Sequence, residues 1–187
     1  MKKIVHFILI ASVLVLWGIS SSACSETEEV SRYDNWQARN ESFIDSLKNV
    51  YDAKTDPNLY AVVDPNSSVS DREQLVFYKK EIQTDEGLTP MFNDSIVVYY
   101  HGTNILGERF DGNFDGKEVQ INDKPTGFRL NNNISGWIWP LHIGGMREGE
   151  RWKIFIPWQS GYGERGSGSI LGYSTLIFTI QLEKVVQ

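Results

Sequence analysis

Aromatic, glycine and acidic residues gather in five short motifs within the second half of the sequence. Most of their side chains are rings or hydrogen-bond donors, and none forms an evident pair of nucleophile and base. Such a set suits a dry site that binds an apolar group and acts by binding the transition state more strongly than the substrate. The motifs are Val98-Tyr99-Tyr100-His101-Gly102, Gly107-Glu108-Arg109-Phe110-Asp111, Ile134-Ser135-Gly136-Trp137, Gly161-Tyr162-Gly163 and Ser174-Thr175-Leu176-Ile177-Phe178.

Three signals of other chemistry are present, but each lacks a required part. Gly161–Gly166 spells the GxGxxG pattern of dinucleotide sites, yet it leads toward a strand and not toward a phosphate-binding helix. His101 and His142 have no third ligand at metal spacing. The serines lack a GxSxG elbow, which disfavours a hydrolase. We therefore expect a site without metal or cofactor.

The five motifs, in this order, resemble those of the FKBP-type peptidyl-prolyl cis-trans isomerases, from about Val76 to the end of the chain. The resemblance implies rotation of Xaa-Pro bonds, which needs no nucleophile. The barrier is about 18–20 kcal/mol because rotation breaks amide resonance. The twisted amide is less polar than the planar one, so a dry aromatic pocket favours it. Proline-containing polypeptides are the expected partners, and macrolides are possible pocket ligands.

The resemblance also implies a role for each site residue. Trp137 matches the floor under the proline ring, and Asp111 matches the carboxylate that faces the twisting carbonyl. Tyr162 matches a hydroxyl that binds a substrate carbonyl. Ile134 matches the residue whose backbone meets the peptide, and Ile170 falls on a flap before the last strand. The aromatic walls match Tyr100, Phe110 and Phe178.

Two departures from the family pattern concern the surroundings of Asp111. The family often has an arginine a few residues later, but Gly112–Gly116 contain none and Lys117 is the nearest cation that follows. Thr126 stands where a pocket phenylalanine is expected, with Phe128 two residues further on. These departures favour a second hypothesis, a proline-recognition or chaperone module with little or no turnover.

Two further positions leave alternatives open. The flap reads Ile170-Leu171-Gly172-Tyr173, without the usual prolines, and is expected to be more flexible. Trp139 competes with Trp137 for the pocket floor, because aligning Trp139 needs no insertion before Gly149. The motif Ile134–Trp137 favours Trp137.

Strand patterns dominate from Leu75 onward. Val76–Ile82 is predicted as a first strand, residues 96–101 and 152–156 as later strands, and Leu176–Glu183 as the last. A short helix is predicted around Trp139–Met146, where Pro140 suits the first turn. These elements predict an α+β domain in which an antiparallel sheet wraps over a short helix, as in the FKBP architecture.

An amphipathic helix is predicted ahead of this domain, over residues 34–51. Asp34 is a candidate N-cap, and Asp56-Pro57 lies beyond the helix end. A helix this short must pack on something. It either docks on the C-terminal domain or forms a homodimer with a second copy, and the sequence does not separate the two. Its apolar residues are Trp36, Phe43, Ile44, Leu47, Val50 and Tyr51.

The first residues predict export and lipid attachment. Lys2 and Lys3 precede an apolar run and small residues, which is the pattern of a signal peptide. The run is shorter than the ~20 residues that span a bilayer. Cys24, the only cysteine, resembles the lipidated residue of a bacterial lipoprotein, although Ser21 replaces the usual leucine. Plain secretion is the alternative.

These features predict a lipid-anchored protein of the cell envelope, at the periplasmic face or the outer-membrane surface. The acidic stretch Ser25–Glu29 resembles a surface-export signal of Bacteroidetes lipoproteins. The predicted parts are a signal peptide over 1–23, a tether with a helical segment over 24–75, and an isomerase domain over 76–187. With 18 basic against 24 acidic side chains, the chain has no excess of positive charge for nucleic acid.

Overall fold

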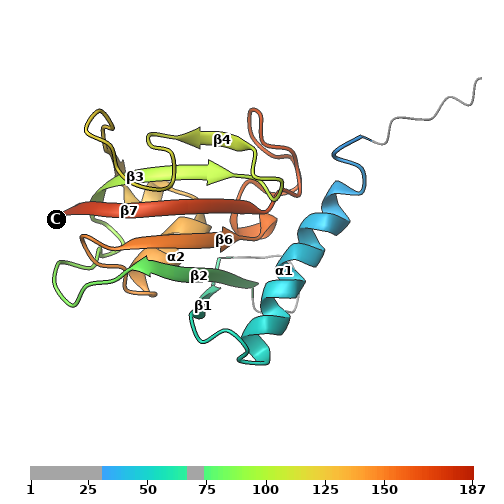
Figure 1. Ribbon diagram of the computed structural model, residues 1–187, viewed down its shortest axis with the longest axis horizontal. Coiled ribbons are helices and arrows are strands. Elements are labelled where there is room, and N and C mark those ends of the chain that lie inside the picture. Colours follow the sequence, from blue (N-terminus) through green and yellow to red (C-terminus); the bar gives the residue numbers. More distant parts are fainter. Residues whose placement is uncertain (1–30, 67–73) are drawn as a thin grey trace, which may run out of the picture. The chain divides into compact units, whose positions relative to one another are not determined.

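The computed structural model describes residues 31–66 and 74–187, so the predicted signal peptide, Cys24 and the acidic stretch lie outside the described residues. Residues from Tyr33 to Gln187 form one compact unit. It is built on a seven-stranded antiparallel sheet that carries a helix on each face (Figure 1). Within the described part of the chain, no helix has both the length and the apolar character needed to cross a membrane.

The strands lie in the spatial order β1, β2, β6, β7, β3, β4, and β5 also pairs with β3. The strands predicted over 76–82, 96–101, 152–156 and 176–183 are confirmed. β1, β4 and β5 were not predicted: β4 and β5 have only four residues each, and β1, which reads Leu-Tyr-Ala-Val-Val-Asp, does not alternate between apolar and polar residues. The bounds are β1 Leu59–Asp64, β2 Gln74–Ile82, β3 Ser95–Thr103, β4 Arg109–Gly112, β5 Thr126–Arg129, β6 Arg151–Ile156 and β7 Leu176–Val186, with 3₁₀ turns η1 Leu130–Asn132 and η2 Trp158–Ser160.

The first face of the sheet packs on helix α2, Ser135–His142, and together they form the main core. Successive side chains of a strand point to opposite faces, so alternate residues of β6 and β7 line this core. The predicted α+β architecture, an antiparallel sheet over a short helix preceded by an amphipathic helix, is confirmed. The core residues of these three elements are Trp137, Ile138, Leu141, Trp152, Ile154, Ile156, Leu176, Phe178, Ile180, Leu182 and Val185.

The predicted bounds of α2 were wrong. The helix begins at Ser135, so Pro140 lies inside it and not in its first turn. The missing proline N–H is tolerated because hydrogen bonds on either side close the turns. The Ile138 N–H donates to the Ile134 carbonyl at 3.3 Å, and the Ile143 N–H donates to the Trp139 carbonyl at 2.9 Å. Proline was read as a start signal, whereas it sits late in a helix of only eight residues.

Helix α1, Trp36–Asp52, packs on the second face of the sheet. Phe43, Ile44, Leu47 and Val50 cover a small apolar cluster of Leu59, Phe77 and Phe155. Figure 1 shows the helix crossing the end of the sheet formed by β1, β2 and β6. Of the two predicted roles, docking on its own chain is the one seen in the structure, and dimerisation stays a prediction.

The start of α1 is held by tertiary hydrogen bonds. The predicted N-cap Asp34 is wrong, because the cap position is Asn35, in the left-handed region with φ of 53° and without a side-chain capping bond. The Trp36 indole donates to the Ser174 hydroxyl at 3.0 Å. The fully buried Asn40 side chain accepts from the Thr175 N–H at 2.7 Å. Contacts with residues far away in the sequence therefore hold the start of the helix in position.

Candidate functional site

Trp137 lies at the centre of a set of rings that we call the aromatic cluster. Its ring contacts Tyr100, Phe128 and Phe178 at centroid separations of 5.5, 5.7 and 5.1 Å, with interplanar angles of 73°, 85° and 89°. Phe110 joins through Phe178, at 5.4 Å. Such edge-to-face contacts fix ring orientation. Trp137 and Phe178 are buried, whereas the other three rings are partly exposed and keep aromatic surface accessible.

Two glycines make this close packing possible. On β3, a Cβ at Gly102 would lie only 2.6 Å from the Phe110 ring and 2.7 Å from the Phe178 ring. At Gly136 a Cβ would lie 2.2 Å from Cγ2 of Ile156, so glycine lets α2 approach β6 closely. Both glycines belong to the motifs of the sequence, and both set the position of the cluster.

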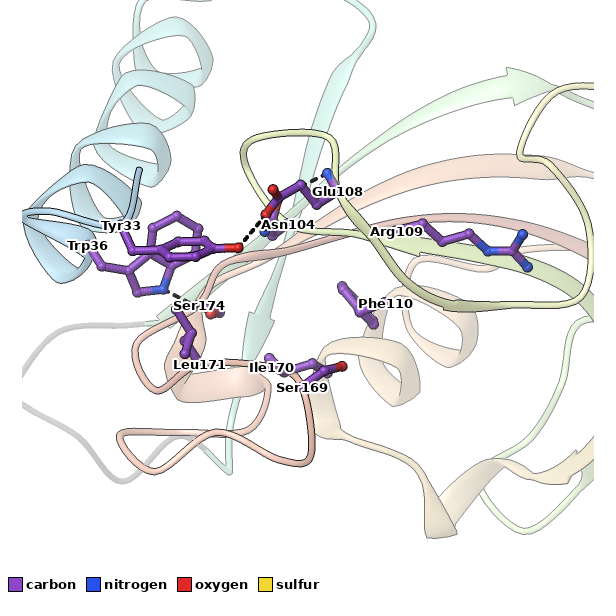
Figure 2. Close-up of a pocket in the computed structure, with 10 residues that line it drawn as sticks. All are labelled: Tyr33, Trp36, Asn104, Glu108, Arg109, Phe110, Ser169, Ile170, Leu171 and Ser174. Carbon is purple, nitrogen blue, oxygen red and sulfur yellow. Dashed lines mark hydrogen bonds between the residues drawn. The ribbon is translucent and has the colours of Figure 1, made fainter. Parts of the chain in front are cut away.

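A cavity of about 220 Å³ adjoins the aromatic cluster, and we call it the side cavity. Phe110 and Ile170, two residues predicted for the site, form one part of its wall. Tyr33 and Trp36, from the segment that precedes the sheet, stand on the opposite side (Figure 2). The remaining lining residues are Asn104, Glu108, Arg109, Ser169, Leu171 and Ser174.

A polar edge borders the cluster at Asp111. The Tyr100 hydroxyl donates to Asp111 Oδ1 at 3.2 Å, and the Gly112 N–H donates to the same oxygen at 2.7 Å. Burial, then the nearby charge of Asp111 and this hydrogen bond, raise the pKa of Tyr100 to about 12. Burial and the Asp111 charge also raise the pKa of Tyr162. Both hydroxyls therefore stay protonated donors well above neutral pH, beside one carboxylate.

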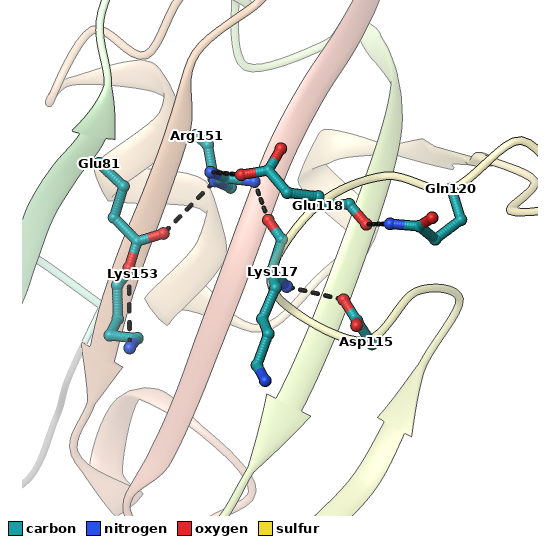
Figure 3. Close-up of polar contacts among 7 residues, drawn as sticks. All are labelled: Glu81, Asp115, Lys117, Glu118, Gln120, Arg151 and Lys153. Carbon is teal, nitrogen blue, oxygen red and sulfur yellow. Dashed lines mark hydrogen bonds and ion pairs between the residues drawn. The ribbon is translucent and has the colours of Figure 1, made fainter.

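Arg109 holds the backbone that carries Asp111. Its guanidinium donates to the Gly112 carbonyl at 2.5 Å and to the Asp111 carbonyl at 3.4 Å. Lys117, the next cation in the sequence, instead has its backbone carbonyl bound by Arg151 (Figure 3). The cation near Asp111 is thus Arg109, which precedes it in the sequence. The sequence analysis looked for a cation only after Asp111 and missed this role of Arg109.

Arg151 ties the connection between β4 and β5 to the second face of the sheet. Its side chain is only 10% exposed and pairs with Glu118 at 3.0 Å and with Glu81 at 3.5 Å. Lys153 also reaches Glu81, at 3.7 Å, but is 41% exposed (Figure 3). The buried arginine therefore organises this group, and the lysine adds little.

Asn113 supports Tyr100 from the gap between β4 and β5. Its Oδ1 accepts from the Tyr100 N–H at 2.8 Å. Its Nδ2 donates to the Val98 carbonyl at 3.0 Å and to the Thr126 hydroxyl at 3.1 Å. The side chain thus replaces ladder bonds where β3 changes partners. The sequence carries no signal for this role, which depends on strand pairing.

Tyr162 and Ile170 lie on the loop between η2 and β7. Ser167 and Ile170 exchange two backbone hydrogen bonds of 2.9 Å, which close a tight turn although the flap lacks prolines. The GxGxxG pattern over 161–166 is followed by turns and then by β7. The predicted absence of a helix directly after it is therefore confirmed.

Trp137 occupies the aromatic cluster, whereas Trp139 stacks on Phe92 at 6.1 Å, away from it. Phe128 enters the cluster from β5 and contacts Tyr100 at 5.6 Å. The sequence analysis noted Phe128 only as a displaced phenylalanine. Residues two apart on a strand share a face, so its spacing from Thr126 could have placed it in the site.

His101 and His142 take no part in the cluster. His101 Nδ1 lies 3.1 Å from the Phe114 carbonyl, and His142 Nδ1 lies 3.0 Å from the Pro90 carbonyl. Among the described residues, no group of three His, Cys, Asp or Glu side chains could hold a metal ion. What the arrangement offers is ring surface beside tyrosine donors, which suits binding of an apolar ring with an adjacent carbonyl group.

About half of the sequence is similar to curated proteins. The sequence is 37% identical over 106 residues to the FKBP-type 22 kDa peptidyl-prolyl cis-trans isomerase of Escherichia coli (strain K12), covering 56% of this chain and 48% of the relative. It is 35% identical over 107 residues to the outer membrane protein MIP of Legionella longbeachae, covering 57% and 42%. The chain therefore spans about half the length, or less, of these curated relatives.

A solved peptidyl-prolyl cis-trans isomerase from Pseudomonas syringae pv. tomato str. DC3000 shares the fold. Its TM-score is 0.60 at 23% identity, and the match covers 84% of this chain and 98% of the solved chain. The family model described as FKBP-type peptidyl-prolyl cis-trans isomerase matches residues 87–183. Since that match includes more than half of the sequence, the chain belongs to the FKBP-type peptidyl-prolyl cis-trans isomerase family.

Proposed function

We propose that this protein catalyses cis/trans rotation of Xaa-Pro bonds in polypeptides. The observation that carries the proposal is the buried Trp137, enclosed edge-on by Tyr100, Phe128 and Phe178. A proline ring placed on this surface leaves water, and its amide meets a less polar environment. The planar amide loses hydration there, whereas the less polar twisted amide loses less, so the barrier falls.

The polar edge supplies orientation. Tyr162 stays protonated because its pKa is raised, so its hydroxyl can donate to a substrate carbonyl, whereas the Tyr100 hydroxyl donates to Asp111 at 3.2 Å. Asp111 is exposed and held by Gly112, which places its negative charge beside the cluster. Ile134, directly before α2, provides backbone next to Trp137, and Ile170 closes the side toward the flap.

A second candidate is a proline-recognition module that turns over slowly. The observation in its favour is that no arginine side chain bonds to the Asp111 carboxylate among the described residues, since Arg109 bonds only to backbone carbonyls there. The carboxylate is then less firmly oriented toward a twisting amide. This candidate keeps the aromatic cluster and its ligands, which include proline-containing segments and macrolides.

Exchange NMR on a panel of short Xaa-Pro peptides tests the proposal. We expect the protein to accelerate exchange, a macrolide to abolish the effect, and Phe110→Ala to lower the rate at least tenfold. Phe92→Ala is the matched control, because Phe92 is 39% exposed and stacks on Trp139 outside the cluster. Shift changes without acceleration would support the recognition module. A Phe110→Ala protein that is folded and fully active would overturn the site.

We also propose that the protein acts in the cell envelope, anchored by lipid at Cys24. The support is the signal-like start of the sequence and a relative named as an outer membrane protein. Mass spectrometry of the protein isolated from membranes tests this, because lipidation adds a mass to the Cys24 peptide that Cys24→Ser removes. An unmodified Cys24 peptide in the mature protein would refute anchoring.

A further inference from the structure

The side cavity is built jointly by the isomerase-family domain and by the segment ahead of it. Tyr33 and Trp36 precede the family match over 87–183, yet they face Phe110 and Ile170 across the cavity (Figure 2). The Trp36 indole is fixed by Ser174, and the rings of Tyr33 and Trp36 meet edge-on at 5.3 Å. The rings of Tyr33 and Trp36, which lie outside the family match, are therefore fixed at the side of the site.

Three of the polar groups around the cavity, from Tyr33, Asn104 and Glu108, bond to one another. Glu108 Oε2 accepts from the Tyr33 hydroxyl at 2.8 Å and from Asn104 Nδ2 at 2.8 Å. These bonds hold the β3–β4 turn against Tyr33. With these polar groups paired to each other, the rings and aliphatic side chains of the lining form an apolar surface that a ligand can meet, and Arg109 and Ser169 add polar surface beside it.

The cavity lies within reach of a peptide seated on Trp137. The Trp137 and Phe110 rings each contact Phe178, at 5.1 and 5.4 Å, and Phe110 is part of the cavity wall. An extended chain advances ~3.3 Å per residue, so two or three residues from the proline suffice. The volume of about 220 Å³ far exceeds the ~10–15 Å³ that one water needs and is enough for one large apolar side chain.

We propose that the side cavity is a specificity subsite of the isomerase, which binds an apolar side chain two or three residues from the isomerised proline. The proposal rests on the proposed function, because the same polypeptide occupies the aromatic cluster. It gives the segment around Tyr33 and Trp36 a part in substrate choice. The preferred substrates are then polypeptide segments with a leucine-like or aromatic residue near the Xaa-Pro bond.

The test compares two peptides with the same Xaa-Pro core, one of four residues and one extended by three residues on each side, with leucine at the added positions that lie two or three residues from the proline. The variants are Tyr33→Ala and Leu171→Ala. The matched control is Leu88→Ala, because Leu171 and Leu88 are similarly exposed, at 44% and 48%, but only Leu171 lines the cavity. Exchange rates and peptide affinities are measured for each protein, with thermal unfolding as the check on folding.

We expect the wild-type protein to favour the long peptide in kcat/KM and affinity, and both variants to reduce that preference about tenfold. The short peptide should react at an unchanged rate, and Leu88→Ala should change neither peptide. An equal loss on both peptides would show a general disturbance of the site and overturn the subsite, as would a preference that survives both variants. Absence of acceleration with both peptides would refute the isomerase, and the affinities would then decide the subsite separately.

Discussion

Replacing Gly102 by alanine tests whether the aromatic cluster is set by close backbone approach. The added Cβ would lie 2.6 Å from the Phe110 ring and 2.7 Å from the Phe178 ring, whereas ordinary contacts begin at 3.4 Å. The rings must therefore shift by about 0.8 Å. Overpacking of this kind costs about 1–3 kcal/mol. Phe110 is partly exposed and has room to move, so we expect about 1–2 kcal/mol of lost stability.

The same shift should lower activity more than stability. A displacement of about 1 Å in a site can cost on the order of a hundredfold in rate, so we expect a ten- to hundredfold fall in kcat/KM for a short Xaa-Pro peptide. Urea unfolding gives the stability change, and exchange NMR gives the rate. Because 1.36 kcal/mol corresponds to tenfold, the two losses are directly comparable.

Gly127→Ala is the matched control. Gly127 also lies on a strand beside β3, without a positive φ, and a Cβ there meets nothing within 4 Å. Both substitutions reduce the freedom of the unfolded chain alike, so their difference isolates the contact with the rings. We expect Gly127→Ala to be neutral or stabilising by up to about 1 kcal/mol. If Gly102→Ala behaved the same way, the packing argument would be refuted.

Three further outcomes are expected. The free energy of unfolding should fall as pH rises from about 10 to about 12. Burial is the main reason why the pKa values of Tyr78 and Tyr100 are raised to about 12 in the folded protein. In the unfolded chain these tyrosines lose their protons near pH 10, so the folded state binds more protons across this range. Stability from this source is complete below pH 10, and tyrosinate absorbance with urea unfolding at each pH checks it. Asn40→Ala should cost about 1–3 kcal/mol in thermal unfolding, because it leaves the buried Thr175 N–H unpaired. Arg151→Ala should cost about 2 kcal/mol by urea unfolding, since it removes a side chain that is only 10% exposed and that bonds the Lys117 carbonyl and the Glu118 carboxylate.

Each of these expectations has a result that would contradict it. All tyrosines titrating near pH 10 would refute the pH argument. Asn49→Ala, an exposed change on the same helix, should be nearly neutral, and equal losses for Asn40 and Asn49 would contradict the role of the buried amide. Lys153→Ala should cost well under 1 kcal/mol because that ion pair is exposed, and a loss as large as that of Arg151→Ala would show that burial is not what matters.

The sequence was sufficient to predict the strands with a strong pattern and the residues with a distinctive spacing. Trp152, Ile154 and Ile156 alternate cleanly, so β6 was found with its inward face correct. The rings of Tyr100 and Trp137, separated by 37 positions in the sequence, were expected together from the motif order and do meet in the structure. Local pattern and motif order were the informative signals.

What the sequence did not provide depends on pairing between distant segments. Asn113 is an ordinary loop residue until β3 changes partners beside it. The anchoring of α1 relies on Ser174 and Thr175, which stand more than 130 residues away, so the expected local cap at Asp34 was wrong. Pro140 led to wrong bounds for α2, because proline was taken to mark the first turn of a helix. In the structure it lies inside the helix, six residues from its start at Ser135 counting both ends.

The place of β7 has a consequence for how the protein folds. This strand comes last of all, yet it lies between β6 and β3 and joins the two halves of the sheet. Until residues 176–186 are available, the earlier strands form two separate groups that each expose a long unpaired edge, and α1 lacks its anchors at Ser174 and Thr175. The complete sheet therefore cannot close until this strand has emerged, and on a nascent chain the two groups remain unjoined until then.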